Sequence, residues 1–195
     1  MKVVKLTDEQ EVKIIDKWNE LTLGKYIQLV NLMQNQEKYT NSEFSLRCLE
    51  KVTSLSYEEI LELYNEDYDI LANELFCQGS FLHTEIKEEK ATNWIFNEID
   101  YSVVFPERIR LGEKQSLDIL DKDAKSTYDQ WLNILSIFVR PAIKTKNEFG
   151  EDIYNIEKFN ADMDSINKRK ELIYNNMPAV NAIWICNFFA NGKIR

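Results

Sequence analysis

Glycine and proline, the residues that most readily form tight turns, are scarce in this chain of 195 residues, which holds five glycines and three prolines. An all-β sandwich needs many tight turns, so this scarcity argues against that class. Hydrophobic residues make up 44% of the chain and aromatic residues 12%, which is enough for a core and excludes a disordered chain. The length fits one large domain or two small ones.

Apolar residues recur at helical spacing over most of the chain and predict amphipathic helices. Local signals support several helix ends: Thr22 is a candidate N-cap, and Ser56 with Glu59 forms a capping box. Pro178 and Gly192 mark the two ends of the last helix. The segments predicted to be helical are residues 8–36, 41–52, 56–64, 67–76, 126–140, 156–174 and 179–190. A short strand over 12–15 is an alternative within the first of them.

One segment has a different pattern. Residues 92–104 are rich in β-branched and aromatic side chains with partial period-two alternation, which predicts a strand or small hairpin with a turn near Asn97-Glu98. Pro141 is expected to end the preceding helix, and residues 144–153, with Gly150, to form a flexible loop. The predicted fold class is therefore mainly α, a multi-helix domain with a small β element near 94–104.

The two halves of the chain resemble each other faintly. Leu23-Gly24 and Leu111-Gly112 lie 88 residues apart, and apolar positions of the helices that follow match at the same offset. Chance matches at helical spacing are common. The prediction is a single helical domain over 1–195, with a duplication of two similar halves, 1–90 and 91–195, as the alternative.

Three widely spaced cysteines, Cys48, Cys77 and Cys186, each stand among apolar neighbours. An odd number in this setting indicates reduced, buried thiols in a cytosolic protein. The N-terminus has no long apolar core, so no signal peptide is expected. The apolar segment 179–190 is too short to span a bilayer.

The chain is acidic, with 24 Lys and Arg against 33 Asp and Glu, a formal charge of −9. Nucleic-acid binding needs a basic face and is not expected. The acids concentrate between residues 52 and 86, where no Lys or Arg occurs, and Glu58, Glu62 and Glu66 are predicted to share one helix face. This face is either solvated surface or a docking surface for a basic partner. A calcium loop would need a glycine and a final Glu that are missing here, so no metal site is predicted.

No catalytic constellation is recognisable. The lone histidine, His83, has Cys77 and Glu85 nearby in sequence, but that spacing specifies nothing. No Gly-rich phosphate loop is present. The basic run 168–170 is flanked by acids and is interpreted as charge pairing on a helix surface. We therefore predict no catalytic, cofactor-binding or metal-binding residue, no cofactor and no enzymatic activity. A hydrolase with scattered carboxylates is an alternative.

The apolar segment 179–190 must bury most of its circumference. It is interpreted as a core helix or, alternatively, as a helix that docks into another subunit with Trp184 and Phe188 as anchors. Together with Glu58, Glu62 and Glu66, these two aromatic residues are the predicted partner-binding residues.

Residues 18–29 contain Leu21-Thr22-Leu23-Gly24-Lys25-Tyr26-Ile27. This stretch resembles the "Leu-Thr-x-Gly-x-Tyr-Ile" helix start of small acidic helical proteins of tailed bacteriophages. Residues 54–60, 133–141 and 177–180 fit the same layout, so the resemblance covers most of the chain through short motifs. Such proteins are similar to tail assembly chaperones and other morphogenesis or virion components.

The resemblance implies a non-enzymatic role in particle assembly. The expected partners are other phage structural proteins or copies of the chain itself, with neither nucleic acid nor membrane among them. The expected location is the host cytoplasm during assembly, or the virion. An adaptor or regulatory module of a bacterium, working through the same acidic helix, is the alternative.

Overall fold

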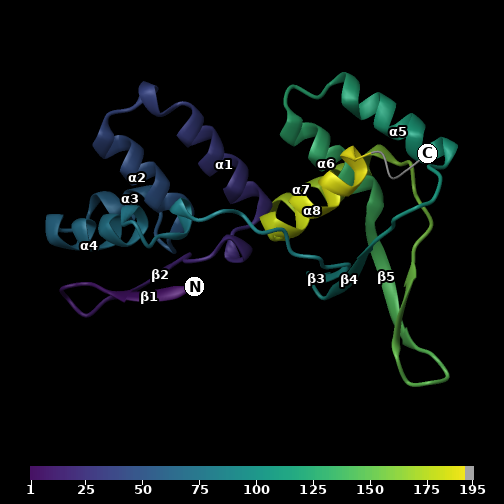
Figure 1. The fold of residues 1–195 in the computed structure, drawn as a ribbon, viewed down its shortest axis with the longest axis horizontal. Coiled ribbons are helices and arrows are strands. Elements are labelled where there is room, and N and C mark those ends of the chain that lie inside the picture. The colour runs from purple at the N-terminus through teal and green to yellow at the C-terminus, as the bar shows by residue number, and fades with distance from the viewer. Residues whose placement is uncertain (192–195) are drawn as a thin grey trace. The chain divides into compact units, whose positions relative to one another are not determined.

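The computed structural model describes residues 1–191, and these divide into two compact units (Figure 1). The N-terminal unit comprises Met1–Lys87 together with Pro178–Val180. Among the described residues, the C-terminal unit comprises Glu88–Met177 together with 181–191. The division therefore falls close to the predicted halves, except that the start of the last helix belongs with the first unit.

The N-terminal unit consists of a hairpin followed by four helices. The hairpin pairs β1 (Lys2–Lys5) with β2 (Glu11–Ile14) in antiparallel fashion. The helices are α1 (Leu23–Gln34), α2 (Asn41–Val52), α3 (Tyr57–Leu61) and α4 (Asn65–Phe76), with the single 3-10 turns η1 (Trp18–Glu20), η2 (Gln36–Lys38) and η3 (Phe81–His83) between or after them.

Side-chain caps mark where α1, α2 and α3 begin. Thr22 accepts a hydrogen bond from the Lys25 amide, as predicted for the start of α1. The predicted capping box of α3 is confirmed, because Ser56 and Glu59 bond each other's backbone amides at 3.2 and 2.7 Å. Buried Asp67 accepts bonds from Thr7, which ties α4 to the hairpin turn.

The C-terminal unit places helices against a four-stranded antiparallel sheet of order β3-β4-β5-β6. Its strands are β3 (Asn93–Phe96), β4 (Ile99–Val103), β5 (Val139–Lys146) and β6 (Asp152–Ile156). Its helices are α5 (Leu111–Lys122), α6 (Thr127–Phe138), α7 (Met163–Asn176) and α8 (Ala179–Ala190), whose first two residues belong to the other unit.

Both units follow the same path at their start. In each, a hairpin leads into a twelve-residue helix that begins with Leu-Gly, then into a second helix, and the chain then returns beside the second hairpin strand. The return is made by matching hydrogen bonds, from the Ile15 amide to the Val52 carbonyl at 2.7 Å and from the Val104 amide to the Phe138 carbonyl at 2.8 Å. The C-terminal unit then adds the long β5–β6 hairpin. A common origin of the two halves stays a prediction.

The predicted fold class, mainly α with one small β element, is wrong, because the described residues form a mixed α/β structure with six strands in two sheets. The hairpin predicted near 94–104 is present, and Asn97 and Glu98 form its turn with positive φ angles of 50° and 66°. The predicted helices also covered parts of two other hairpins. The helix predicted over 8–36 included β2, where the alternative strand over 12–15 is the better interpretation. The helix predicted over 126–140 included the start of β5.

The β5–β6 hairpin replaces the predicted loop over 144–153. The helix before Pro141 does end, at Phe138, but the chain continues as a strand. The Pro141 carbonyl accepts a hydrogen bond of 2.9 Å from the Glu157 amide. Because proline has no backbone N–H, only one hydrogen bond is lost, at the end of the β5–β6 pairing. Gly150 supplies the turn with a φ of 79°. The helix predicted over 156–174 begins only at Met163, and Gly192 lies outside the described residues.

Two of the three thiols are buried as predicted. Cys48 and Cys186 lie in the interiors of their units, whereas Cys77 is exposed, contrary to the prediction. Cys77 ends α4, where apolar neighbours in sequence do not ensure burial. Burial raises the pKa of Cys48 to about 12 and also raises the pKa of Cys186.

We expect one thiol per native chain to react with a thiol-specific reagent near neutral pH. The thiolate is the reacting form, and burial both suppresses it and blocks access at Cys48 and Cys186. Mass spectrometry of the digested, labelled protein should locate the early label at Cys77. Labelling in denaturant is the control and should reach all three cysteines. Fast native labelling of Cys48 would contradict the buried placement.

No helix within residues 1–191 is long and apolar enough to cross a lipid bilayer.

Candidate functional site

A groove of about 560 Å³ opens in the C-terminal unit between one face of the sheet and α7. Directly paired strand residues share a face, and the pairs Trp94–Tyr101–Pro141 and Phe96–Ile99 place the groove's apolar residues on a single side of the sheet. The facing wall is α7, from Ser165 to Asn176. The volume lies in the range of roughly 300–1,000 Å³ found for ligand sites.

Two arginines meet at the base of the groove because both bind the C-terminal end of α6. The Arg140 Nε donates to the Ile137 carbonyl and the Arg169 Nε donates to the Ser136 carbonyl, each at 2.8 Å. Such carbonyls have no partner within the helix, and the helix dipole favours cations there. Arg140 also pairs with buried Glu113 and lies over the Phe159 ring, so its charge is compensated.

Arg169 differs from Arg140 because its hydrogen bonds go to backbone carbonyls and not to a carboxylate, although Glu157 and Asp162 lie close enough to favour its charge. Its Nη2 lies 3.5 Å from the Asn160 carbonyl, and the pKa of Arg169 is lowered by burial and by the neighbouring charge of Arg140. Both effects penalise the charged guanidinium. An anionic group bound beside it would offset them.

The charged residues of the groove, apart from Arg140, are three cations and two carboxylates: Lys158, Lys168, Arg169, Glu157 and Glu171. Within residues 1–191, none of the three cations forms an ion pair. The basic run 168–170 was predicted to be paired charge on a helix surface; among the described residues it forms no ion pair, although Arg169 and Lys170 each interact electrostatically with two nearby carboxylates. The groove therefore has one more cation than carboxylates, beside an aromatic floor.

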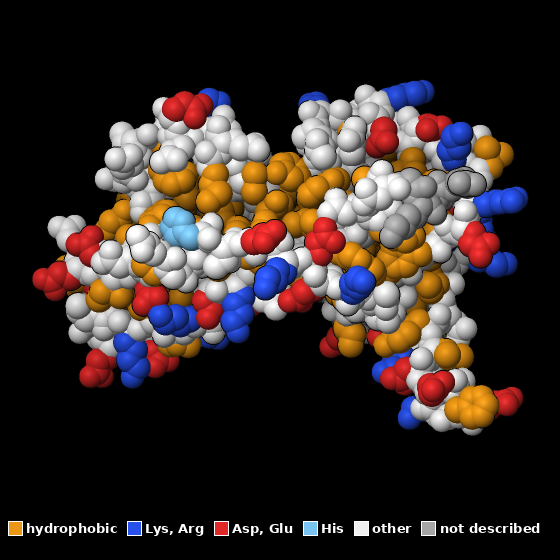
Figure 2. Space-filling model, in the orientation of Figure 1, with side chains coloured by type: hydrophobic (Ala, Val, Ile, Leu, Met, Phe, Trp, Pro, Cys, Tyr) orange, Lys and Arg blue, Asp and Glu red, His pale blue; other side chains and the backbone are white. Residues whose placement is uncertain are grey.

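The apolar side of the groove continues onto the β5–β6 hairpin, which extends away from the helices of its unit (Figure 1). Pro141 and Ile143 alternate along β5, and the pair Thr145–Ile153 carries the same face across to β6. Ile143 is 66% exposed, and Phe149 in the turn is 86% exposed. Figure 2 shows a hydrophobic side chain at the hairpin tip. The groove and the hairpin thus form one interrupted apolar row, which we call the sheet face.

The predicted acidic residues lie in the N-terminal unit, but not on one helix face. Glu58 is in α3, Glu62 caps its C-terminus and Glu66 is in the first turn of α4. Tyr64 between them has an extended backbone, with a ψ of 152°, so the chain changes direction there. The prediction of a shared helix face is therefore wrong.

All three of these glutamates are exposed, and two apolar side chains are exposed among them. Leu61 is 54% exposed and Tyr64 is 75% exposed. We call residues 57–66, with these side chains, the acidic knob.

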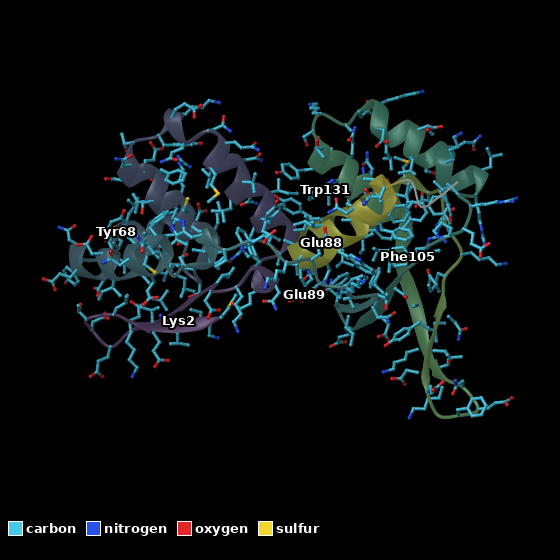
Figure 3. All side chains as sticks on the ribbon, in the orientation of Figure 1. Lys2, Tyr68, Glu88, Glu89, Phe105 and Trp131 are labelled. Atoms are coloured by element: carbon cyan, nitrogen blue, oxygen red, sulfur yellow. The ribbon has the colours of Figure 1, made fainter. Side chains whose placement is uncertain are left out.

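The predicted aromatic anchors lie against their own unit. Phe105, labelled in Figure 3, packs edge-on against Trp184 and Phe188 of α8, with ring centroids 5.3 and 4.4 Å away. Glu88, also labelled there, accepts a hydrogen bond from Asn187 of the same helix. Both anchors are half-buried, and packing with Phe105 accounts for their apolar character. This packing favours the core interpretation of α8, and a docking role of Trp184 and Phe188 stays a prediction.

The other candidates stay apart from the groove. His83 is exposed in η3 of the N-terminal unit. Within the described part of the chain, no group of three or more His, Cys, Asp or Glu side chains is placed to hold a metal ion. Sequence reasoning missed the groove because its floor comes from strands some 40 residues apart, and only the β4–β5 register brings Tyr101 beside Pro141.

Comparisons of the chain with family models, with curated proteins and with solved structures found no match.

Proposed function

We propose that the chain is a non-enzymatic bacteriophage structural or assembly protein that acts by binding another protein through the sheet face. The observation that carries the proposal is the apolar row that leaves the groove and continues, exposed, along a projecting hairpin. Large exposed apolar side chains grouped on one face in this way are typical of interaction sites.

The arrangement suits a protein segment that carries both apolar and polar groups. The groove is apolar on the sheet side and polar on the α7 side, so it can bury side chains while amides such as Asn160 and Asn175 bond a backbone. The exposed side chains of Ile143 and Ile153 extend the contact surface beyond the groove. These features support binding, and the phage context is supported by the resemblance of residues 18–29 and the related segments.

The proposal is tested by replacing the exposed apolar residues of the hairpin. The variant Ile143→Ser/Ile153→Ser should keep the fold, since both side chains are exposed, and should lose partner capture about tenfold or more, because each buried isoleucine contributes roughly 1.5–3 kcal/mol. The measurement is quantitative cross-linking and mass spectrometry of the tagged chain in phage-infected cells.

The matched control uses the opposite face of the same two strands. Lys144→Ser/Asp152→Ser removes an exposed ion pair of 2.8 Å, which contributes little to stability. This control should capture the partner as well as the unmodified chain does. Equal capture by the isoleucine variant, or capture that never includes a phage structural protein, would overturn the proposal.

A further inference from the structure

We propose that the groove of one copy binds the acidic knob of a second copy, so that the chain assembles head to tail. This inference rests on the proposed function and deepens it, since it names a second copy of the chain as an occupant of the groove. It follows from complementary charge and complementary apolar surface, each present on a different unit.

The groove side offers an aromatic floor and a cationic wall. Phe96 and Tyr101 line the floor, with Ile99 half exposed at its edge. Lys168 and Arg169 stand on α7 above them, and together with Lys158 they outnumber the carboxylates of the groove, Glu157 and Glu171, by one. A fitting occupant carries a large apolar side chain flanked by carboxylates.

The acidic knob has this composition. Tyr64 and Leu61 are exposed, and Glu62 and Glu66 flank the tyrosine. Neither the core nor the helix explains Tyr64: it occupies the N-cap of α4 without a capping hydrogen bond, where Ser, Thr, Asp or Asn would stabilise the helix. A locally unfavourable and exposed aromatic residue is expected where binding needs it.

The distribution of charge along the chain favours attraction between different units of two copies. Residues 1–87 carry nine Lys and Arg against sixteen Asp and Glu, whereas residues 88–195 carry fifteen against seventeen. Because most of the net negative charge is in the N-terminal unit, contact between two such units is repulsive. Contact of the acidic knob with the groove brings opposite charges together.

The contact is heterologous, because the two surfaces are different patches of the chain. Each copy that uses its knob still has a free groove, so association continues into a ring or an open filament. We expect light scattering of the purified chain to give a mass that rises with concentration in multiples of 23.1 kDa. High salt should lower that mass, since the charged part of the contact is screened.

Two variants separate the surfaces. The knob variant Tyr64→Ser/Glu62→Lys suits its local positions, because Ser is favoured at an N-cap and Lys at a helix C-terminus. The groove variant Lys158→Glu/Lys168→Glu changes exposed side chains. Each variant alone should be monomeric. Mixed together, they should form a species of twice the chain mass and nothing larger, because one supplies the only intact groove and the other the only intact knob.

Controls make the same charge changes at exposed positions elsewhere. Glu37→Lys and Lys114→Glu/Lys125→Glu should assemble like the unmodified chain. Circular dichroism of every variant checks that the fold is kept.

The inference is overturned if the chain is a monomer at all concentrations, including the case in which the knob binds the groove of its own chain. It is also overturned if the knob and groove variants assemble like the unmodified chain. Failure of the mixed variants to form a dimer overturns it as well. A monomeric chain that still loses its phage partner on Ile143→Ser/Ile153→Ser would leave the proposed function standing. If the chain is monomeric and its capture of a phage partner does not depend on Ile143 and Ile153, both the inference and the proposed function are rejected.

Discussion

Replacing Glu113 by alanine is expected to destabilise the C-terminal unit by about 3–5 kcal/mol, the cost of leaving a buried charge without its partner. Glu113 and Arg140 are 2% and 5% exposed and form an ion pair. Glu113 also accepts a hydrogen bond of 2.9 Å from the Arg110 amide at the start of α5. The alanine variant therefore loses a helix cap and leaves the Arg140 guanidinium buried with carbonyl and aromatic neighbours only.

The measurement is urea denaturation, with hydrogen exchange to show that the loss of protection falls on α5, α6 and β5. The variant Glu113→Leu/Arg140→Met provides the comparison, because it removes both charges at similar volume. It should recover most of the stability, since apolar replacement of a buried ion pair is often neutral or stabilising. If the single and double variants are equally destabilised, an uncompensated charge is not the cause.

The second large effect is expected at Phe138. This side chain is fully buried, packs with Leu120, Ile137 and Ile166, and stacks on Phe189 with ring centroids 4.4 Å apart. Phe138→Ala should cost about 3–5 kcal/mol, from the lost transfer free energy and the cavity that remains. Because Phe138 also ends α6 and precedes β5, the loss should be visible in both elements by hydrogen exchange.

Phe149→Ala is the matched control, because it makes the same chemical change at an exposed position in the hairpin turn. Its effect on the free energy of unfolding should stay within about 0.5 kcal/mol. A comparable loss at Phe149 would mean that the hairpin tip is packed in solution, and an effect below 1 kcal/mol at Phe138 would contradict the assigned core.

Signals that act within a few residues were read correctly from the sequence. The cap at Thr22, the capping box at Ser56 and the turn at Asn97-Glu98 each depend on neighbouring backbone groups. Helices α2, α4 and α6 were predicted to within about two residues for the same reason. The break between α3 and α4 was predicted just after residue 64 and lies at residues 62–64, so only the shared helix face of Glu58, Glu62 and Glu66 was wrong.

Strand pairing over long distances was not readable. Residues 139–146 are a strand because Val103 and Tyr101 pair with them, and those partners lie some 40 residues earlier in the chain. The same pairing places Pro141 on the groove floor. The two arginines at the base of the groove, Arg140 and Arg169, come together because both bind the end of α6.

By itself the sequence determined the acidic charge, most helices, one hairpin and the candidate role of the acidic segment, because composition, periodicity and capping are local properties. Only the tertiary structure decided the mixed fold class, the packing of Trp184 and Phe188 against Phe105, and the groove with Arg169 at its base. These depend on which residues meet across the sheet and at helix ends. Such contacts are selected by packing of the whole unit and not by any one segment.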